Sequence, residues 1–324
     1  MPHMRSRPWM ALSVTVLVAP LAAQAPAALS TEWYLPVAPG CRLYVLELGR
    51  GADTLLVLHG GPGAEHSYLL PVFEGLEDHY HLVFYDQRGS LRSPCPDSLV
   101  TYSGHVEDLD RLRAELGLQR VTIAAHSAGT FLAMMYADRF PNRMKGLILF
   151  GALQPGSPKT AGDSSLQAAS DSMASAFFKR PELAATLERE GLNRDRDRLS
   201  PRDQTFAWRI QFAAVNLFHI ERWRSVRGGQ VFYNSAAAAA AGRTRPVSYD
   251  YTATLAGLPC PVTIIAGDHD FVDMGAVMHR RWAGPLANVH LVVIPNAGHN
   301  AWIDAPDEFR RLLLQGLRRS ADCR

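Results

Sequence analysis

Several features are scarce in this sequence of 324 residues, and each absence removes a class of protein. Lys and Arg (33 residues) nearly balance Asp and Glu (31 residues), and no long run carries one sign, so nothing in the charge supports nucleic-acid binding. No uninterrupted apolar run reaches the ~18 residues of a membrane-spanning helix. The sequence also lacks a repeat of fixed period. What remains is typical of a globular protein with a sizeable core and no membrane span in its mature form.

Cysteine is also scarce, with four residues and no C-x-x-C pair. Without Cys or His at metal-ligand spacing, we expect no metal site and no cofactor. An even number of cysteines permits disulfides in an oxidising compartment. Our preferred pair is Cys260 with Cys323, because one opens a late strand and the other closes the last helix.

The N-terminus has the order of a secretory signal peptide. Arg5 and Arg7 precede about a dozen apolar residues, and small residues follow around Ala23 to Ala28. We therefore interpret residues 1–27 as a signal peptide and expect an exported protein, periplasmic or secreted.

Short β-branched or apolar runs alternate with segments of helical period in the rest of the chain. This alternation predicts a mostly parallel sheet with helices on both faces. One long interval is helical throughout, which predicts a core made of residues 28–153 and 252–324 and a helical cap of residues 154–251 that roofs a site. The expected strands cover residues 41–48, 54–60, 81–87, 120–125, 146–152, 261–267 and 289–295.

The stretch AHSAGT places Ser127 between an expected strand and an expected helix. A serine held in a sharp strand-turn-helix connection, with small residues on both sides, exposes its hydroxyl as a nucleophile. The simpler alternative is a serine that caps the helix.

Two later strand ends supply the partners that a serine nucleophile needs. Asp270 follows the strand at 261–267, and His299 follows the strand at 289–295, which gives the order serine, acid, histidine. His299 would act as the general base and Asp270 would orient it, with Asp268 as the competing acid. A metal site at Asp268, His269 and Asp270 is disfavoured because no further ligand cluster is evident. We expect His126 to be a packing residue beneath the serine.

A second motif, LHGGPG, follows the strand at 54–60. Glycines let main-chain N–H groups approach a developing oxyanion, so Gly61 and Ala128 are the expected donors.

These motifs resemble the proline iminopeptidase family of α/β-hydrolase serine peptidases. The resemblance rests on HGGPG at residues 59–63, YDQRGSLRS at residues 85–93, and the segments around Ser127, Asp270 and His299. It implies an α/β-hydrolase fold, removal of N-terminal residues from small peptides or amides, and acidic cap residues that bind the substrate's ammonium. Glu221 is the nearest candidate for that role, although a solvated helical glutamate is the simpler interpretation.

The sequence departs from the family at Ala125, His126, Ala128 and Leu91, so other functions stay open. One alternative is a carboxylic-ester or lactone hydrolase acting on small apolar substrates. Another is a binding protein without catalysis, which the presence of every expected catalytic group disfavours.

Overall fold

The computed structural model describes residues 30–228 and 232–323. The proposed signal peptide, residues 1–27, therefore lies outside the described residues. In the part of the chain that is described, no helix is both long and apolar enough to cross a bilayer.

An eight-stranded sheet in the order β1-β2-β4-β3-β5-β6-β7-β8 forms the centre of the molecule. The strands from β3 to β8 are parallel, whereas β2 is antiparallel to both β1 and β4. This is the α/β-hydrolase fold that the sequence predicted. The strands are β1 (Ser30–Ala38), β2 (Cys41–Leu48), β3 (Asp53–Leu58), β4 (Tyr80–Tyr85), β5 (Val121–His126), β6 (Met144–Phe150), β7 (Val262–Gly267) and β8 (Val289–Ile294).

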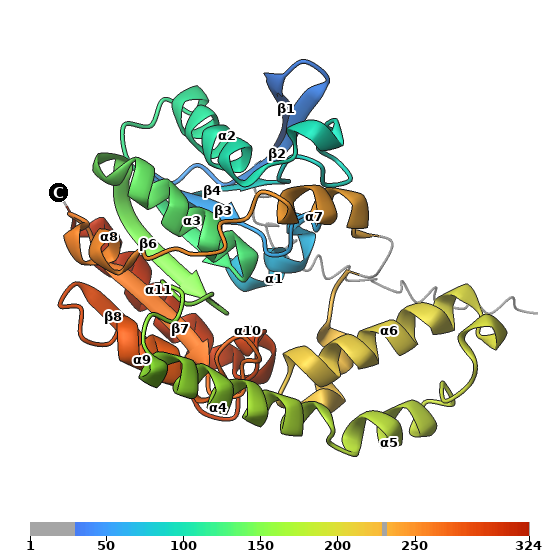
Figure 1. The fold of residues 1–324 in the computed structure, drawn as a ribbon. Helices are drawn as coiled ribbons and strands as arrows, with labels where there is room; N and C mark the ends of the chain where they lie inside the picture. The colour runs from blue at the N-terminus through green and yellow to red at the C-terminus, as the bar shows by residue number, and fades with distance from the viewer. Residues whose placement is uncertain (1–29, 229–231, 324) are drawn as a thin grey trace, which may run out of the picture.

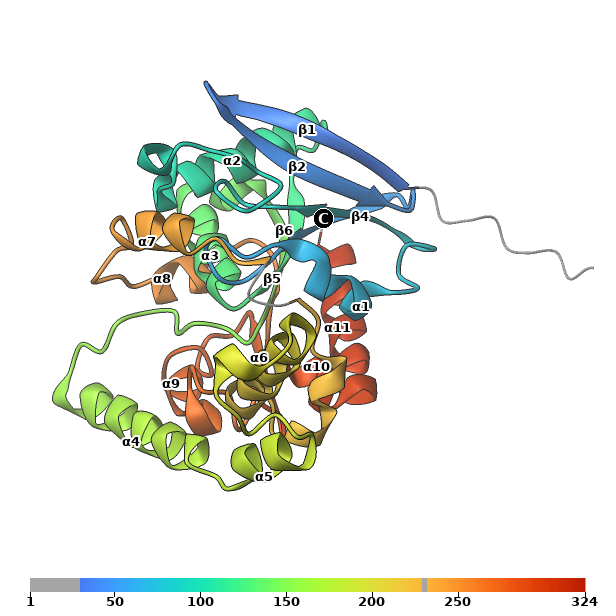
Figure 2. The same cartoon turned by 90° about the vertical axis from the view of Figure 1, so that its right-hand side faces the viewer.

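Helices cover both faces of the sheet (Figures 1 and 2). Alternate residues of a strand point to opposite faces, so Leu56 of β3 packs with α2 and α3 while Val57 packs with α1 and α11. Both faces of the central strands are buried, which explains their continuous apolar sequences. The helices of these layers are α1 (Leu70–Phe73), α2 (Tyr102–Glu115), α3 (Ala128–Arg139), α8 (Thr252–Gly257), α9 (Val277–Trp282), α10 (Ala301–Asp304) and α11 (Pro306–Ala321).

The segment between β6 and β7 holds the remaining helices. Three of its elements share a separate apolar cluster around Ile210 and Trp223, away from the sheet (Figure 1). Their boundaries follow from local signals: Thr160 and Ser200 accept N-terminal hydrogen bonds at α4 and α6. The helices are α4 (Ala161–Phe178), α5 (Glu182–Arg189), α6 (Pro201–Asn216) and α7 (Ser235–Gly242), and the 3₁₀ segment is η5 (Ile220–Ser225).

The alanine-rich helix α7 packs on the sheet layer and not on that separate cluster. Its Ala237 and Ala241 are fully buried within the main core. A Cβ at Gly89 would lie 2.7 Å from the Cβ of Ala237, so glycine facing alanine is what lets this helix approach. The run of alanines is thus a close packing surface.

The seven expected strands are present within about two residues of their predicted ends. The sequence reading missed β1, an edge strand that contains Pro36 and is exposed along most of its length. A strand with a proline and mostly exposed residues lacks the continuous apolar run that marks a buried strand in a sequence.

Our disulfide prediction was wrong. The structure bonds Cys41, at the start of β2, to Cys95 in the loop after β4, and leaves Cys260 and Cys323 as thiols. Helix α11 does bring Cys323 near the start of β7, where its sulfur lies 3.2 Å from the carbonyl oxygen of Pro259.

This disulfide predicts a specific pattern of thiols and stability. The bridge spans 54 residues, so opening it through Cys95→Ser should lower the free energy of unfolding by about 4 kcal/mol. Cys323→Ser is the control and should change it little. Thiol titration of the oxidised, unfolded protein should find Cys260 and Cys323 reactive, and reactive Cys41 would contradict the pairing.

A buried histidine of α2 predicts how stability depends on pH. Both ring nitrogens of His105 are buried without a partner among the described residues, and burial lowers its pKa to about 3. In the unfolded chain, His105 binds a proton below about pH 6.5, whereas in the folded protein it stays neutral down to about pH 3. The contribution of His105 to the free energy of unfolding is therefore lost progressively as the pH falls from about 6.5 toward 3. His105→Leu should therefore remove about 2 kcal/mol of the stability loss between about pH 6.5 and pH 5. Urea unfolding across that range measures it, and an unchanged pH slope would contradict the buried neutral state.

Candidate active site

Ser127 occupies the sharp connection between β5 and α3. Its backbone has φ 53° and ψ −128°, a conformation that non-glycine residues adopt only when their surroundings enforce it. A Cβ at Gly129 would lie 2.5 Å from the carbonyl oxygen of His59, so the turn needs glycine there. Ala125, which stands where glycine is usual, is fully buried and its methyl group is accommodated. This connection leaves Ser127 half-buried at the carboxyl edge of the sheet.

His299 and Asp270 come from the loops after β8 and β7. The Nδ1–H group of His299 donates to Oδ1 of Asp270 over 2.8 Å, and both side chains are buried. The same carboxyl oxygen accepts the N–H of Val272 at 2.9 Å, which fixes its orientation. An imidazole held through Nδ1 presents Nε2 as its free nitrogen.

Asp268, the competing acid, has other partners. Its Oδ1 lies 2.6 Å from Nδ1 of His269 and 3.3 Å from the N–H of Ala297. The structure thus pairs His299 with Asp270 and not with Asp268.

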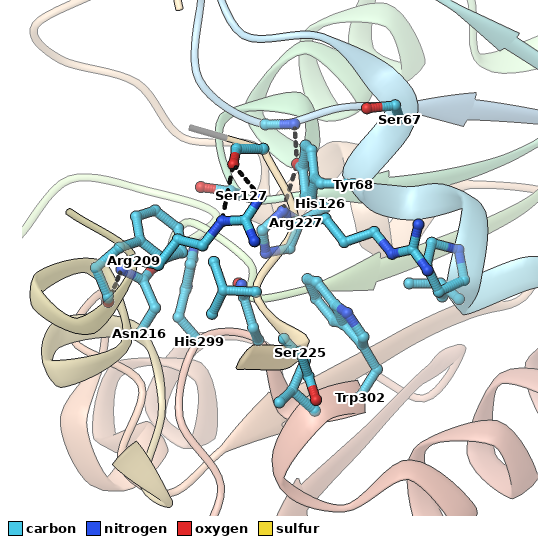
Figure 3. Close-up of a pocket in the computed structure, with 18 of the residues that line it drawn as sticks. Ser67, Tyr68, His126, Ser127, Arg209, Asn216, Ser225, Arg227, His299 and Trp302 are labelled. Carbon is cyan, nitrogen blue, oxygen red and sulfur yellow. Dashed lines mark hydrogen bonds between the residues drawn. The ribbon is translucent and has the colours of Figure 1, made fainter. Parts of the chain in front are cut away.

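Ser127 and His299 line one cavity of about 1540 Å³ (Figure 3). Gly61 lines it as well. Among the described residues, the N–H groups of Gly61 and Ala128 donate to no other group, whereas the N–H of Gly60 is already bonded. Two N–H groups at the carboxyl edge of the sheet are therefore free to bind an oxygen.

The hydroxyl of Tyr68 links the glycine loop to the histidine beside Ser127. It accepts the Gly60 N–H at 2.7 Å and lies 2.7 Å from Nδ1 of His126 (Figure 3). Burial, with a smaller contribution from His299, lowers the pKa of His126 well below its ordinary value. His126 is therefore neutral, and its Nδ1 accepts a hydrogen bond from the Tyr68 hydroxyl.

His126 also packs, as the sequence predicted. Its ring lies 4.7 Å from that of His299 and 4.9 Å from that of Trp302, measured between centroids. Neither Tyr68 nor Trp302 belongs to a recognised motif, so the sequence alone did not point to them.

Hydrogen bonds join the HGGPG loop to the DQRG segment at residues 86–89. His59 Nε2 accepts the N–H of Gln87 at 3.0 Å, and the Gln87 amide donates to the His59 carbonyl at 2.7 Å. Asn234, just before α7, bridges them again: its N–H donates to Gly63 O and its side chain to Gly89 O, both at 2.8 Å. The glycine loop is thus held from two sides.

Glu221 does not reach the cavity. Its side chain is 62% exposed and hydrogen bonds to Nδ1 of His219 at 3.1 Å. The residues that line the cavity include its neighbour Arg222 instead.

One buried group of described residues has the spacing of metal ligands: Glu65, His66 and Asp86. Burial opposes ionisation of Asp86, but hydrogen bonds from His66 outweigh it and lower the pKa of the carboxyl group. A cation is already beside these acids, because Nη1 of Arg92 lies 3.1 Å from Glu65 Oε2 and 3.9 Å from Asp86 Oδ2. The group is therefore an internal ion-pair cluster that holds the DQRG loop.

Comparison with known proteins gives the family. The model of the alpha/beta hydrolase fold family matches residues 53–306, and the chain belongs to this family.

Curated relatives carry the name proline iminopeptidase. The one from Saccharolobus solfataricus is 35% identical over 114 residues, 34% of this chain and 37% of that protein, so the match spans little more than a third of its length. The one from Levilactobacillus brevis is 28% identical over 81% of this chain and 87% of its own. A solved esterase from Thermogutta terrifontis superposes with a TM-score of 0.63 and 21% identity, covering 90% of this chain and 99% of that one.

The Tyr68 network predicts a test of the glycine loop. Tyr68→Phe leaves the Gly60 N–H and His126 Nδ1 unpaired, which should cost about 1–3 kcal/mol of stability. Because Gly60 adjoins Gly61, kcat should fall roughly tenfold with a smaller change in KM. Tyr34→Phe, on the exposed side of β1, is the control. If the Tyr68 variant is destabilised but its kcat is unchanged, the network contributes to stability and not to catalysis.

Proposed function

We propose that this α/β-hydrolase is a serine hydrolase with Ser127 as nucleophile, His299 as general base and Asp270 as the group that orients it. The observation that carries the proposal is that a strained, half-buried serine and an Asp-bonded histidine line the same cavity. A serine that only capped α3 would accept a hydrogen bond from the helix, and Ser127 makes no side-chain cap bond.

The reaction runs in two halves. Ser127 Oγ attacks the carbonyl carbon while its proton passes to His299 Nε2, and the resulting imidazolium gives that proton to the leaving amine or alcohol. The oxyanion formed in between accepts hydrogen bonds from the Gly61 and Ala128 N–H groups. Water then attacks the acyl-enzyme with His299 again as base, which releases the acid and restores Ser127.

Release of N-terminal residues from small peptides or amides is the first candidate activity. Its support is the name of the relatives that match most of the chain at modest identity. An aminopeptidase needs an anion for the substrate's ammonium, and with Glu221 away from the cavity the remaining lining acids are Glu65 and Asp307. Glu65 is already paired with Arg92, which leaves Asp307.

Hydrolysis of carboxylic esters or lactones is the second candidate. The observation that favours it is the aromatic wall: Trp208, Phe212 and Phe271 line the cavity, and the first two stack at 5.1 Å. Such a wall suits an acyl chain and makes no demand for an ammonium.

We also propose that the protein is exported. The N-terminal sequence supports this, and the Cys41–Cys95 bridge adds an independent argument, because disulfides persist in oxidising compartments.

The catalytic assignment predicts the effect of one mutation. Ser127→Ala should lower turnover by at least about 10⁴-fold, because no other group supplies the nucleophile. Ser225→Ala, another cavity serine, should retain activity. Rates on chromogenic substrates measure this, and a Ser127 variant as fast as the wild type would exclude the mechanism.

The same assay separates the two candidate activities. The substrates are prolyl and alanyl arylamides, their N-acetylated forms, and a short-chain aryl ester. Hydrolysis of the free-amine amides, lost on acetylation, would support the aminopeptidase. Cleavage of the ester alone would support the ester hydrolase.

A further inference from the structure

Arginine dominates the charged side chains of the cavity wall. Five arginines and two carboxylates line it. Two of these seven charges are already compensated, since Arg224 pairs with Glu190 and Glu65 pairs with Arg92. Within the described parts of the chain, the other lining arginines form no ion pair with a carboxylate: Arg209, Arg222, Arg227 and Arg310. The cavity therefore has an excess of positive charge.

Two of these arginines are bound to main-chain carbonyls of the sheet domain. Arg222 Nη1 donates to the carbonyls of Ile303 and Asp304, both at 2.7 Å. Arg310 Nη1 donates to Glu74 O at 2.9 Å. These bonds give both side chains a structural role.

Arg209 and Arg227 are different. Arg209 Nε and Nη2 donate to Gly228 O at 3.2 and 3.1 Å, which fixes α6 against the residue that follows Arg227. The Arg227 guanidinium itself has no hydrogen-bond or ion-pair partner in residues 30–228 and 232–323. Figure 3 shows both side chains over the cavity that contains Ser127 and His299.

An arginine in this position attracts anions. A guanidinium presents a rigid fork of N–H donors that matches a carboxylate with two parallel hydrogen bonds. A concave wall with an excess of one sign also concentrates the field, so the attraction is stronger than at an open surface. An ammonium in the same place would be repelled.

We propose that this cavity selects substrates that carry a carboxylate away from the bond that is cleaved, with Arg227 binding that carboxylate and Arg209 positioning the Arg227 segment. The proposal rests on the hydrolase function proposed above and defines its substrate class. The carboxylate can belong to the leaving group, as in a dipeptide with a free C-terminus. It can also belong to the acyl group, as in a monoester of a dicarboxylic acid.

The test compares matched pairs of substrates that differ by this one charge. One pair is prolyl-alanine and prolyl-alanine amide. The other is a monoethyl ester of glutaric acid and ethyl pentanoate. In at least one of the two pairs, we expect the charged substrate to have a kcat/KM at least about tenfold higher than that of its neutral partner, mainly through a lower KM.

Mutation then assigns the preference to a residue. Arg227→Gln should lower the ratio of charged to neutral kcat/KM about tenfold, equivalent to about 1.4 kcal/mol, and Arg227→Lys should restore part of it. Arg198→Gln removes the same charge from an exposed pair with Asp195 outside the cavity, and should leave the ratio unchanged. Equal loss in both Gln variants would indicate a general charge effect and overturn the proposal.

Direct binding separates this proposal from the hydrolase function. Calorimetry with glutarate on the full mature chain should show binding that Arg227→Gln weakens about tenfold. Binding without turnover of any substrate would retain the anion site and reject the hydrolase function. Turnover of the neutral members with no preference for charge, and no glutarate binding, would reject the anion site and retain the hydrolase function.

Discussion

The backbone of Ser127 is the constraint on which the site depends. A positive φ at a non-glycine residue persists only where neighbouring structure enforces it. Here the Ser127 N–H donates to the Phe150 carbonyl at 3.1 Å. Gly129 lies so close to the main chain of His59 that a Cβ there would be 2.5 Å from the His59 carbonyl oxygen. The strained residue is therefore held by β6 on one side and by the glycine loop on the other.

That constraint extends outward through the loops at the same edge of the sheet. The loop after β3 is fixed by His59 to the loop after β4, and Asn234 fixes both to the start of α7. Three chain segments far apart in sequence thus share one hydrogen-bonded unit. A change in any of them acts on the position of Gly61, so residues without chemistry of their own can affect the site.

The sequence predicted the sheet and the candidate triad because both depend on local patterns. Buried parallel strands are continuous apolar runs. Ser127 directly follows one, and Asp270 and His299 lie in the loops that follow two others. The edge strand β1 and the Cys41–Cys95 pair were missed, since one lacks such a run and pairing of cysteines depends on tertiary contacts. The cavity charges were missed for the same reason: a lone arginine belongs to no motif, and packing decides whether Arg227 or Glu221 faces the cavity.

The separate apolar cluster of α5, α6 and η5 has a consequence for how sequence changes combine. Its buried residues, such as Ile210 and Trp223, belong to neither of the two clusters on the faces of the sheet, and it meets the sheet domain mainly at α10. Substitutions at these buried positions and in the clusters on the sheet should therefore have additive effects on stability. The residues of α5, α6 and η5 over Ser127 can then change during evolution without lowering the stability of the sheet that positions Ser127.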